Sequence, residues 1–266
     1  MKNSIVVASA QIECDLLAPD KNFGKAEVFI KMAAEKKAEL IVLPELSDIG
    51  YNLESIKKLN YNTHYILERF SKAAKEYGLY VVAGILEQVE DKKYNTIFVF
   101  DSMGNVVTKY RKISLFGDEK KVFTRGEKLE TFEIGGIRFG LLDCYDIRFP
   151  EISRAYIDRN CSVLLVSSAF PLVRAAHLDI LLKARAIENQ VYVVSSNRVG
   201  ADAGMRLAGN SCIVDPLGNA KSLDALSEGC VDGEIEMDVL RIVRSRMTCI
   251  DDREALKSVL ARQEAI

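Results

Sequence analysis

The chain contains 266 residues, of which 48% are hydrophobic and 28% are charged, so it is long enough to bury a large core. Its formal net charge is −2 and its pI is about 5.9, with the charges interspersed along the chain. This balance excludes the strongly basic surface that attracts nucleic acids or anionic membranes, so we expect no nucleic acid and no membrane as partners.

The first residues, "MKNSIVVASAQIECD", form only a short apolar stretch, without the long apolar region of a secretory signal. No segment approaches the eighteen apolar residues that a membrane span requires. We therefore expect a cytoplasmic protein.

Short apolar runs rich in β-branched residues predict buried strands. They begin at Ser4, Glu39, Leu79, Asn95, Ile137, Ser162, Val191 and Ser211. Between the first three runs, residues 21–39 and 66–78 repeat apolar side chains every three or four positions, which predicts amphipathic helices. Gly78 is placed to end the second helix. The alternation indicates an α/β fold in which helices cover a sheet.

The segment from residue 95 to residue 111 breaks this alternation. Residues 101–105, "DSMGN", join two strand-like runs and are too few to contain a crossover helix, so the sheet is predicted to be mixed. No linker rich in Pro, Gly or Ser divides the chain. We expect a single domain over residues 1–266, with residues 237–266 as a C-terminal tail.

Polar side chains follow several of the predicted strands. Glu45 comes after "LIVLP", Lys112 and Glu119 come after the hairpin, and Cys144 stands between a strand and a helix predicted at residues 149–158. Ligands of open α/β sheets bind at the carboxyl ends of strands, so these residues are candidates for a site. Each of them taken alone also fits a structural position, as a solvated side chain or a buried cysteine. The residues by themselves leave both interpretations open.

The environment of Cys144 has opposing effects on its thiol. A helix N-terminus and nearby cations would lower the pKa of the thiol, whereas Asp143 and Asp146 would oppose that effect. Only His64 and His177 could supply an imidazole, and neither belongs to a metal-binding motif. The six cysteines are scattered without a CxxC pair. We expect no metal, no cofactor and no disulfide framework.

Three motifs, "LPEL", "YRKISLF" and "CYDIRFPE", occur in an order and spacing that resemble the Glu, Lys and Cys signatures of the nitrilase superfamily, the carbon–nitrogen hydrolases. The likeness spans roughly residues 4–236. It implies a four-layer αββα sandwich of two mixed β-sheets with outer helices. It also implies that Cys144 is the nucleophile, Glu45 the general base and Lys112 the cationic stabiliser, with Glu119 as the second glutamate of the family.

These implied roles are chemically consistent with one another. Glu45 would take the thiol proton and later activate water, which removes the need for a histidine. Lys112 and the backbone N–H of Tyr145 would stabilise the oxyanion of the tetrahedral intermediate. The expected products are a thioester and ammonia, and then a carboxylic acid.

Three positions depart from the pattern of the family. Ser114 stands where many relatives have His, His177 where many have Trp, and Asp143 where Ile or Val is usual. None of the three has an implied catalytic role. The reaction class is therefore unaffected, and the subfamily is left open.

The motif around Cys144 resembles that of the amidase branch, which acts on ω-amides of small oxo-acids, whereas true nitrilases usually read "CWE". The resemblance therefore implies hydrolysis of a small primary amide. Hydrolysis of N-carbamoyl amino acids or amines is the alternative, and a nitrilase or a non-catalytic thiol sensor is less favoured.

Substrate contacts are less clearly marked in the sequence. Tyr51 and Tyr145 are candidates, although Tyr51 could equally be a packing residue. Arg174 and Arg198 follow predicted strands and could bind a distal carboxylate of the substrate. Arg148, which lies between two acidic residues, is interpreted as an ion-pair partner that orders the turn.

In the tail, Ala255, Val259 and Leu260 form a partial apolar stripe. A helix of this length is too short to be stable alone. We expect it to pack against its own domain or against a partner. With the pairing habit that the resemblance implies, a homodimer is expected.

Overall fold

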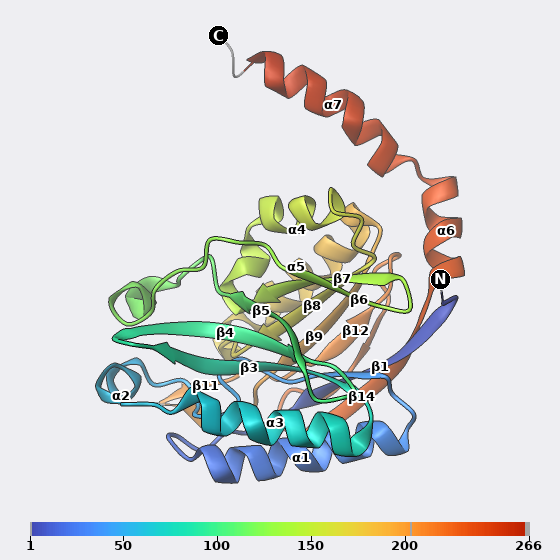
Figure 1. The fold of residues 1–266 in the computed structure, drawn as a ribbon. Coiled ribbons are helices and arrows are strands. Elements are labelled where there is room, and N and C mark those ends of the chain that lie inside the picture. The colour runs from blue at the N-terminus through green and yellow to red at the C-terminus, as the bar shows by residue number, and fades with distance from the viewer. Residues whose placement is uncertain (1, 203, 264–266) are drawn as a thin grey trace.

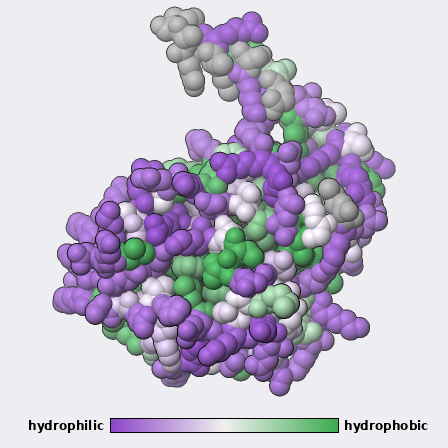
Figure 2. Space-filling view, in the orientation of Figure 1, coloured by the Kyte–Doolittle hydropathy of each residue, from purple (hydrophilic) through white to green (hydrophobic). Residues whose placement is uncertain are grey.

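The computed structural model describes residues 2–202 and 204–263, and its main body is a pair of six-stranded β-sheets. Figure 1 shows helices α1 and α3 on the outer side of one sheet and α4 and α5 on the outer side of the other. In the same view, apolar side chains gather in the middle band of the molecule, and polar side chains surround it (Figure 2). The four layers confirm the αββα sandwich that the resemblance implies.

The first sheet has the order β14-β1-β2-β3-β4-β5 and is mixed. Its parallel strands are β1 (Ser4–Gln11), β2 (Leu40–Val42) and β3 (Tyr80–Val89), and its antiparallel strands are β4 (Lys92–Phe100), β5 (Val106–Arg111) and β14 (Gly229–Glu236). Strands β4 and β5 pair directly across residues 101–105, where Asp101 accepts hydrogen bonds from the backbone of Met103 and Asn105. The predicted hairpin is therefore confirmed.

The second sheet has the order β13-β12-β9-β8-β7-β6 and is also mixed. Its strands are β6 (Thr131–Ile134), β7 (Ile137–Asp143), β8 (Val163–Ser168), β9 (Tyr192–Asn197), β12 (Cys212–Val214) and β13 (Ala220–Ser222). Strands β7, β8 and β9 run parallel, so their carboxyl ends meet at one edge. A small separate hairpin consists of β10 (Ala201–Asp202) and β11 (Met205–Arg206).

The main helices cover the outer faces of the sheets. They are α1 (Pro19–Glu35), α3 (Thr63–Tyr77), α4 (Pro150–Ile157) and α5 (Ala175–Asn189). Shorter elements are α2 (Leu53–Lys58) and the 3₁₀ turns η1 (Gly117–Lys121), η2 (Cys144–Arg148) and η3 (Leu172–Arg174). Gly78 caps α3 with a φ of +70°, in the left-handed region that glycine adopts without strain, which confirms the predicted helix end.

The core has three layers because each sheet is buried on both faces. Val7 and Leu40 of the first sheet pack against Phe139 and Val194 of the second. Separate apolar clusters join α1 and α3 to the first sheet and α4 and α5 to the second. Strands buried on both faces need nearly continuous apolar runs, which is why their sequences stand out.

The C-terminal residues form α6 (Met237–Arg246) and α7 (Cys249–Gln263). Met237 and Leu240 of α6 join the core between the sheets. Helix α7 projects away from the body (Figure 1) and is tied to it where Arg253 and Lys257 pair with Asp158.

The predicted apolar stripe lies on α7. Its residues Ala255 and Val259 are exposed, and the side chain of Leu260 lies outside the described residues. Within the described parts of the chain, none of the helices combines the length and the apolar composition needed to cross a membrane. The cytoplasmic location stays a prediction.

Candidate active site

Three polar side chains that are far apart in the sequence meet between the two sheets. Glu45 follows β2 and Lys112 follows β5 of the first sheet, and Cys144 follows β7 of the second. The Nζ atom of Lys112 donates a hydrogen bond to Oε1 of Glu45 at 2.6 Å. Cys144 lines the same cavity as Lys112, and the charge of Glu45 acts on its thiol. The fold thus brings together the carboxylate, the ammonium and the thiol that the motifs single out.

The carboxylate of Glu45 is fully buried and held on both oxygens. Its Oε1 accepts from Nδ2 of Asn95 at 2.6 Å as well as from Lys112, and its Oε2 accepts from the backbone N–H of Ala169 at 2.9 Å. The loop that carries Glu45 lies directly on β3 at Gly84, where an added Cβ would come within 2.6 Å of the Pro44 carbonyl oxygen. The absence of a side chain at that position lets the loop reach its place.

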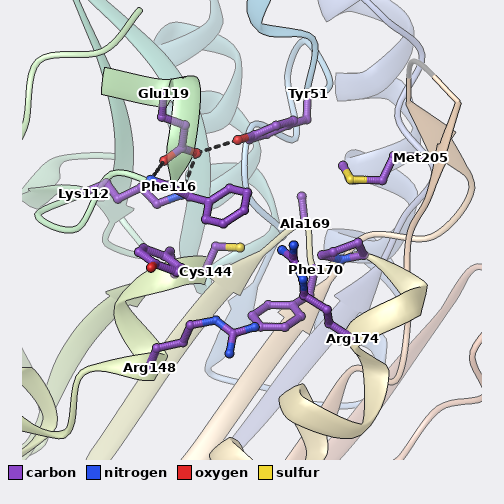
Figure 3. A pocket seen from close by; sticks show the side chains of 12 residues that line it. Tyr51, Lys112, Phe116, Glu119, Cys144, Arg148, Ala169, Phe170, Arg174 and Met205 are labelled. Atoms are coloured by element: carbon purple, nitrogen blue, oxygen red, sulfur yellow. Dashed lines mark hydrogen bonds and ion pairs between the residues drawn. The ribbon is translucent and has the colours of Figure 1, made fainter. Parts of the chain in front are cut away.

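Lys112 bridges Glu45 to a second carboxylate, that of Glu119 on η1. Its Nζ atom donates to Oε1 of Glu119 at 2.9 Å, and Lys112 is 1% exposed. Glu119 also accepts from the hydroxyl of Tyr51 at 2.8 Å and from the backbone N–H of Phe116 at 2.6 Å. Figure 3 shows this chain from Tyr51 through Glu119 to Lys112.

Cys144 occupies a strained turn at the end of β7. Its φ is +43°, in the left-handed region that residues with a Cβ seldom adopt. The turn is held by the buried carboxylate of Asp146, which accepts from the hydroxyl of Tyr110 at 2.7 Å and from the backbone N–H groups of Ser114 and Asp143 at 2.8 and 3.0 Å. Such strain persists where the surrounding structure fixes a functional group.

Electrostatics determine the resting protonation states. Burial disfavours the ammonium of Lys112, but the charges of Glu45 and Glu119 raise its pKa well above the usual value. Burial would raise the pKa of Glu45, but the charge and hydrogen bond of Lys112 bring it below the usual value. Burial and the charge of Glu45 raise the pKa of Cys144 well above the usual value, although Lys112 opposes them. The resting site therefore has a neutral thiol beside an ionised carboxylate.

The thiol opens onto a small cavity of about 70 Å³. Its lining residues are Tyr51, Lys112, Phe116, Glu119, Cys144, Tyr145, Arg148, Ala169, Phe170, Pro171, Arg174 and Met205. The two predicted substrate contacts, Tyr51 and Tyr145, are both among them. A cavity of this size suits a short acyl chain.

Two arginines, Arg148 and Arg174, line the cavity together with Cys144 (Figure 3). The guanidinium of Arg148 lies 5.0 Å from the ring centre of Phe170, and that of Arg174 lies 5.0 Å from the ring centre of Phe116. Both side chains are half-buried. Among the described residues, neither has a carboxylate within ion-pair distance.

The structure corrects two predictions about arginines. Arg148 is not an ion-pair partner that orders the turn; it faces the cavity and approaches Nδ1 of His177 at 3.4 Å. Arg198 does not bind substrate at this cavity, because it is fully buried and donates to Asp202 and to the Cys14 carbonyl. Of the two arginines proposed as carboxylate ligands, only Arg174 lines the cavity.

Some site residues had little or no sequence signal. Asn95 and the backbone of Ala169 hold Glu45, and Phe116 and Met205 form cavity wall. Of these, two could have been suspected: Phe116 is the last residue of the motif "YRKISLF", and Asn95 is a polar residue at the start of an apolar run. The described residues contain no group of three or more His, Cys, Asp or Glu side chains placed to hold a metal ion.

Comparisons with known proteins agree with this geometry. The family model described as carbon–nitrogen hydrolase matches residues 6–245. The chain is 35% identical over 250 residues to a 2-oxoglutaramate amidase from Bacillus subtilis (strain 168), covering 92% of this chain and 96% of that relative. It is 34% identical over 254 residues to a nitrilase from Pyrococcus abyssi (strain GE5 / Orsay), covering 93% and 95%.

A solved structure of an amidase from Nesterenkonia sp. AN1 superposes with a TM-score of 0.84 at 27% identity, covering 91% of this chain and 97% of that one. In that structure acrylamide has undergone Michael addition at the active-site cysteine. The predicted cysteine-dependent hydrolysis of amide C–N bonds is confirmed, and these relatives do not favour the N-carbamoyl alternative. The chain therefore belongs to the carbon–nitrogen hydrolases of the nitrilase superfamily and is an amidase-like enzyme of that family.

Proposed function

We propose that the enzyme hydrolyses ω-amides, the monoamides of short dicarboxylic acids such as succinamate and glutaramate, to ammonia and the dicarboxylate. The observation that carries this proposal is the pair Arg148 and Arg174 on the cavity wall. Two half-buried guanidiniums without a carboxylate of the described chain leave positive charge facing the cavity. The distal carboxylate of an ω-amide would neutralise that positive charge, and arginine binds carboxylates in a bidentate geometry.

The Bacillus subtilis relative supports the same substrate class. Its name states that it acts on 2-oxoglutaramate, which is itself an ω-amide with a carboxylate at the far end. The small cavity further favours a short linear acyl chain over a bulky aromatic one.

In the acylation step, Sγ of Cys144 attacks the amide carbonyl carbon while Glu45 takes the thiol proton. The ammonium of Lys112 and the backbone N–H of Tyr145 stabilise the oxyanion that forms. Glu45 then gives its proton to the amide nitrogen, the C–N bond breaks, and ammonia leaves behind a thioester on Cys144.

In the second step, Glu45 removes a proton from a water molecule that attacks the thioester carbonyl. The C–S bond breaks, the thiolate of Cys144 regains a proton from Glu45, and the carboxylic acid is released. Glu119 touches Lys112 throughout, so its role is to hold the ammonium in position.

The test is ammonia release by the purified protein from matched substrates. Succinamate and butyramide differ by a carboxylate in place of a methyl group, and glutaramate and pentanamide form a second such pair. We expect the two charged amides to be cleaved faster than butyramide and pentanamide. They should also be cleaved faster than the corresponding nitriles and than N-carbamoyl amino acids. Equal rates for charged and neutral amides would contradict the proposal. Fastest cleavage of carbamoyl compounds, with carbon dioxide released alongside ammonia, would transfer the assignment to that branch.

We also propose that the protein is a homodimer in which α7 packs against the second copy. The helix projects from the body (Figure 1), and its residues Leu256 and Val259 are 53% and 49% exposed. Burying such side chains favours association, because exposed apolar surface is costly in water. Light scattering at micromolar concentration should give the mass of a dimer, and Leu256→Glu with Val259→Glu should give a monomer. A stable wild-type monomer would contradict this proposal.

A further inference from the structure

Asp143 is a buried carboxyl group that the reaction scheme does not use. It is the last residue of β7, directly before Cys144, and its side chain is fully buried. The resemblance to the family predicts an apolar residue at this position. A carboxyl group here therefore needs a physical explanation that is particular to this chain.

Three carboxyl groups surround the single ammonium of Lys112. The Nζ atom lies 2.6 Å from Glu45, 2.9 Å from Glu119 and 3.7 Å from Asp143. If all three were ionised, one positive charge would face three negative charges in a site from which water is excluded. Like charges in such a site cannot all persist, so one of the three carboxyls carries a proton.

Hydrogen bonding identifies which carboxyl carries it. Glu45 accepts three hydrogen bonds, from Lys112, Asn95 and Ala169. Glu119 also accepts three. Both oxygens of Asp143 are buried and accept none. Hydrogen-bond donors stabilise the ionised form of a carboxyl group, so the proton is retained by the group that lacks them.

The proton on Asp143 has an acceptor nearby, because the Asp143 carboxyl and the Glu45 carboxylate both lie beside the Nζ atom of Lys112, at 3.7 and 2.6 Å. We propose that Asp143 is a neutral carboxylic acid in the resting enzyme, donates its proton in a hydrogen bond to Glu45, and thereby sets the upper pH limit of the reaction. It is a positioning residue, because it acts on the substrate only through Glu45. The electrostatics agree, since burial and the charge of Glu45 raise the pKa of Asp143 well above its usual value, although Lys112 opposes them.

Loss of that proton at high pH would slow the reaction. An ionised Asp143 would place a second net negative charge beside the thiol and beside the position where the oxyanion forms, and it would repel the Glu45 carboxylate. The titratable groups that face it from the surrounding elements are Glu45 after β2, Tyr110 in β5, Lys112 after β5, and Cys144 and Asp146 on η2. Glu119 on η1 shares Lys112 with it.

The test compares the pH profile of kcat/KM in the wild type and in Asp143→Asn, on whichever amide the enzyme cleaves best. The amide side chain keeps the shape and can still donate to Glu45 but cannot ionise. We expect kcat/KM at pH 7 to stay within about tenfold of the wild type, as for the change of one hydrogen bond. The alkaline fall in activity should move upward by about one pH unit or more. This inference rests on amide hydrolysis at Cys144 and not on the proposed acyl specificity.

An infrared measurement tests the protonation state without any substrate. At pH 8 the wild type minus Asp143→Asn difference spectrum should contain the carbonyl stretch of a protonated carboxylic acid, shifted in D₂O. Asp48→Asn is the matched control: Asp48 is another fully buried carboxyl, and burial raises its pKa to about 6. It is therefore largely ionised at pH 8, and its replacement should remove no such band and leave the alkaline limb in place.

Thermal stability supplies a third readout that does not depend on activity. A carboxyl whose pKa is raised on folding stabilises the fold at low pH, and this stability is lost as pH rises toward the folded pKa. The Tm of Asp143→Asn minus that of the wild type should therefore increase from about pH 4 upward. Should the amide variant fail to fold, Asp143→Val removes the same titration and should show the same shift of the alkaline limb.

Three results would overturn the inference. One is an alkaline limb identical in the wild type and both Asp143 variants. Another is an infrared difference spectrum without a carboxylic acid band at pH 8. The third is a loss of more than about a hundredfold in kcat/KM at pH 7 by a folded Asp143→Asn, which would mean that the ionised form takes part in the reaction.

Discussion

The base of the cavity and its rim use charge in opposite ways. The base consists of Lys112 and Glu119, which line the cavity, and of Glu45, which pairs with Lys112 behind them. The rim consists of Arg148 and Arg174. At the base, the side chains are at most 1% exposed and opposite charges pair within the protein. At the rim, the two guanidiniums are half-buried and have no carboxylate partner among the described residues. In the proposed reaction, the base of the cavity needs no charge from the substrate and acts on any amide that reaches Cys144. The rim lacks a negative partner, so we expect the charge of the substrate to decide which amides bind there.

The largest effect should come from removing the nucleophile. Without the thiol of Cys144 no thioester can form, so Cys144→Ala should fold and show only background ammonia release. Cys249→Ala is the matched control, because Cys249 is exposed and lies on α7, outside the cavity. Iodoacetamide should alkylate both residues, with inactivation following the label on Cys144 by mass spectrometry. Appreciable turnover by Cys144→Ala on a true substrate would disprove the mechanism.

Removing the proposed general base, the carboxylate of Glu45, should have the next largest effect. Glu45→Gln keeps the size of the side chain but cannot accept the thiol proton, so kcat should fall by about 10²–10⁴-fold. The burial of Glu45 and Lys112 adds a stability cost, since breaking a buried pair typically costs about 3–5 kcal/mol. Melting curves recorded with the kinetics separate the two effects. A folded variant with wild-type kcat would show that Glu45 is a structural partner only.

A smaller effect is expected from Tyr51→Phe, which removes the hydroxyl that donates to Glu119 at 2.8 Å. The net loss of one hydrogen bond is about 0.5–1.5 kcal/mol, so kcat should fall by up to about tenfold through a less well held Lys112. Tyr65→Phe removes a comparable hydroxyl–carboxylate contact, to Asp20, on the exposed surface. Stopped assays of both variants should show a loss for Tyr51→Phe alone, and equal losses would contradict the role of Glu119.

The smallest effect should be that of salt, which distinguishes the rim from the base. Ions screen partly exposed charges much more than buried ones. Raising the ionic strength should therefore increase KM for succinamate by a few-fold through Arg148 and Arg174, while its kcat and the KM for butyramide stay constant. A KM for succinamate that does not respond to salt would argue against arginine at the binding site.

The parts of the fold that could be predicted are those whose pattern is contained in their own residues. Strands β7, β8 and β9 are continuous apolar runs, and α3 has an amphipathic pattern with its own glycine cap. Strand β14 was not predicted, because its sequence "GCVDGEIE" is largely polar. It is a strand because β1 pairs with it along its whole length, and that partner lies more than two hundred residues away.

The same distinction applies to the site. Glu45, Lys112, Glu119 and Cys144 were singled out by their motifs, and the fold brings them together. Arg148 was misinterpreted because Asp146 is near it in sequence, whereas in the structure Asp146 binds the Tyr110 hydroxyl and two backbone N–H groups instead. The Asp146 carboxylate is therefore occupied by other donors, and the guanidinium of Arg148 faces the cavity instead. Such competition between partners can be settled only when distant segments are placed together.

The most direct test of the division between base and rim is kcat/KM for succinamate and for butyramide, measured on the wild type and on Arg148→Gln combined with Arg174→Gln. Hydrogen bonds to charged groups contribute about 1.5–3 kcal/mol each, so the double variant should lose at least about a hundredfold with succinamate. Its kcat/KM for butyramide should stay within about threefold, because Cys144 and the base of the cavity are unchanged. Equal losses with both amides, or wild-type activity on succinamate, would contradict the account.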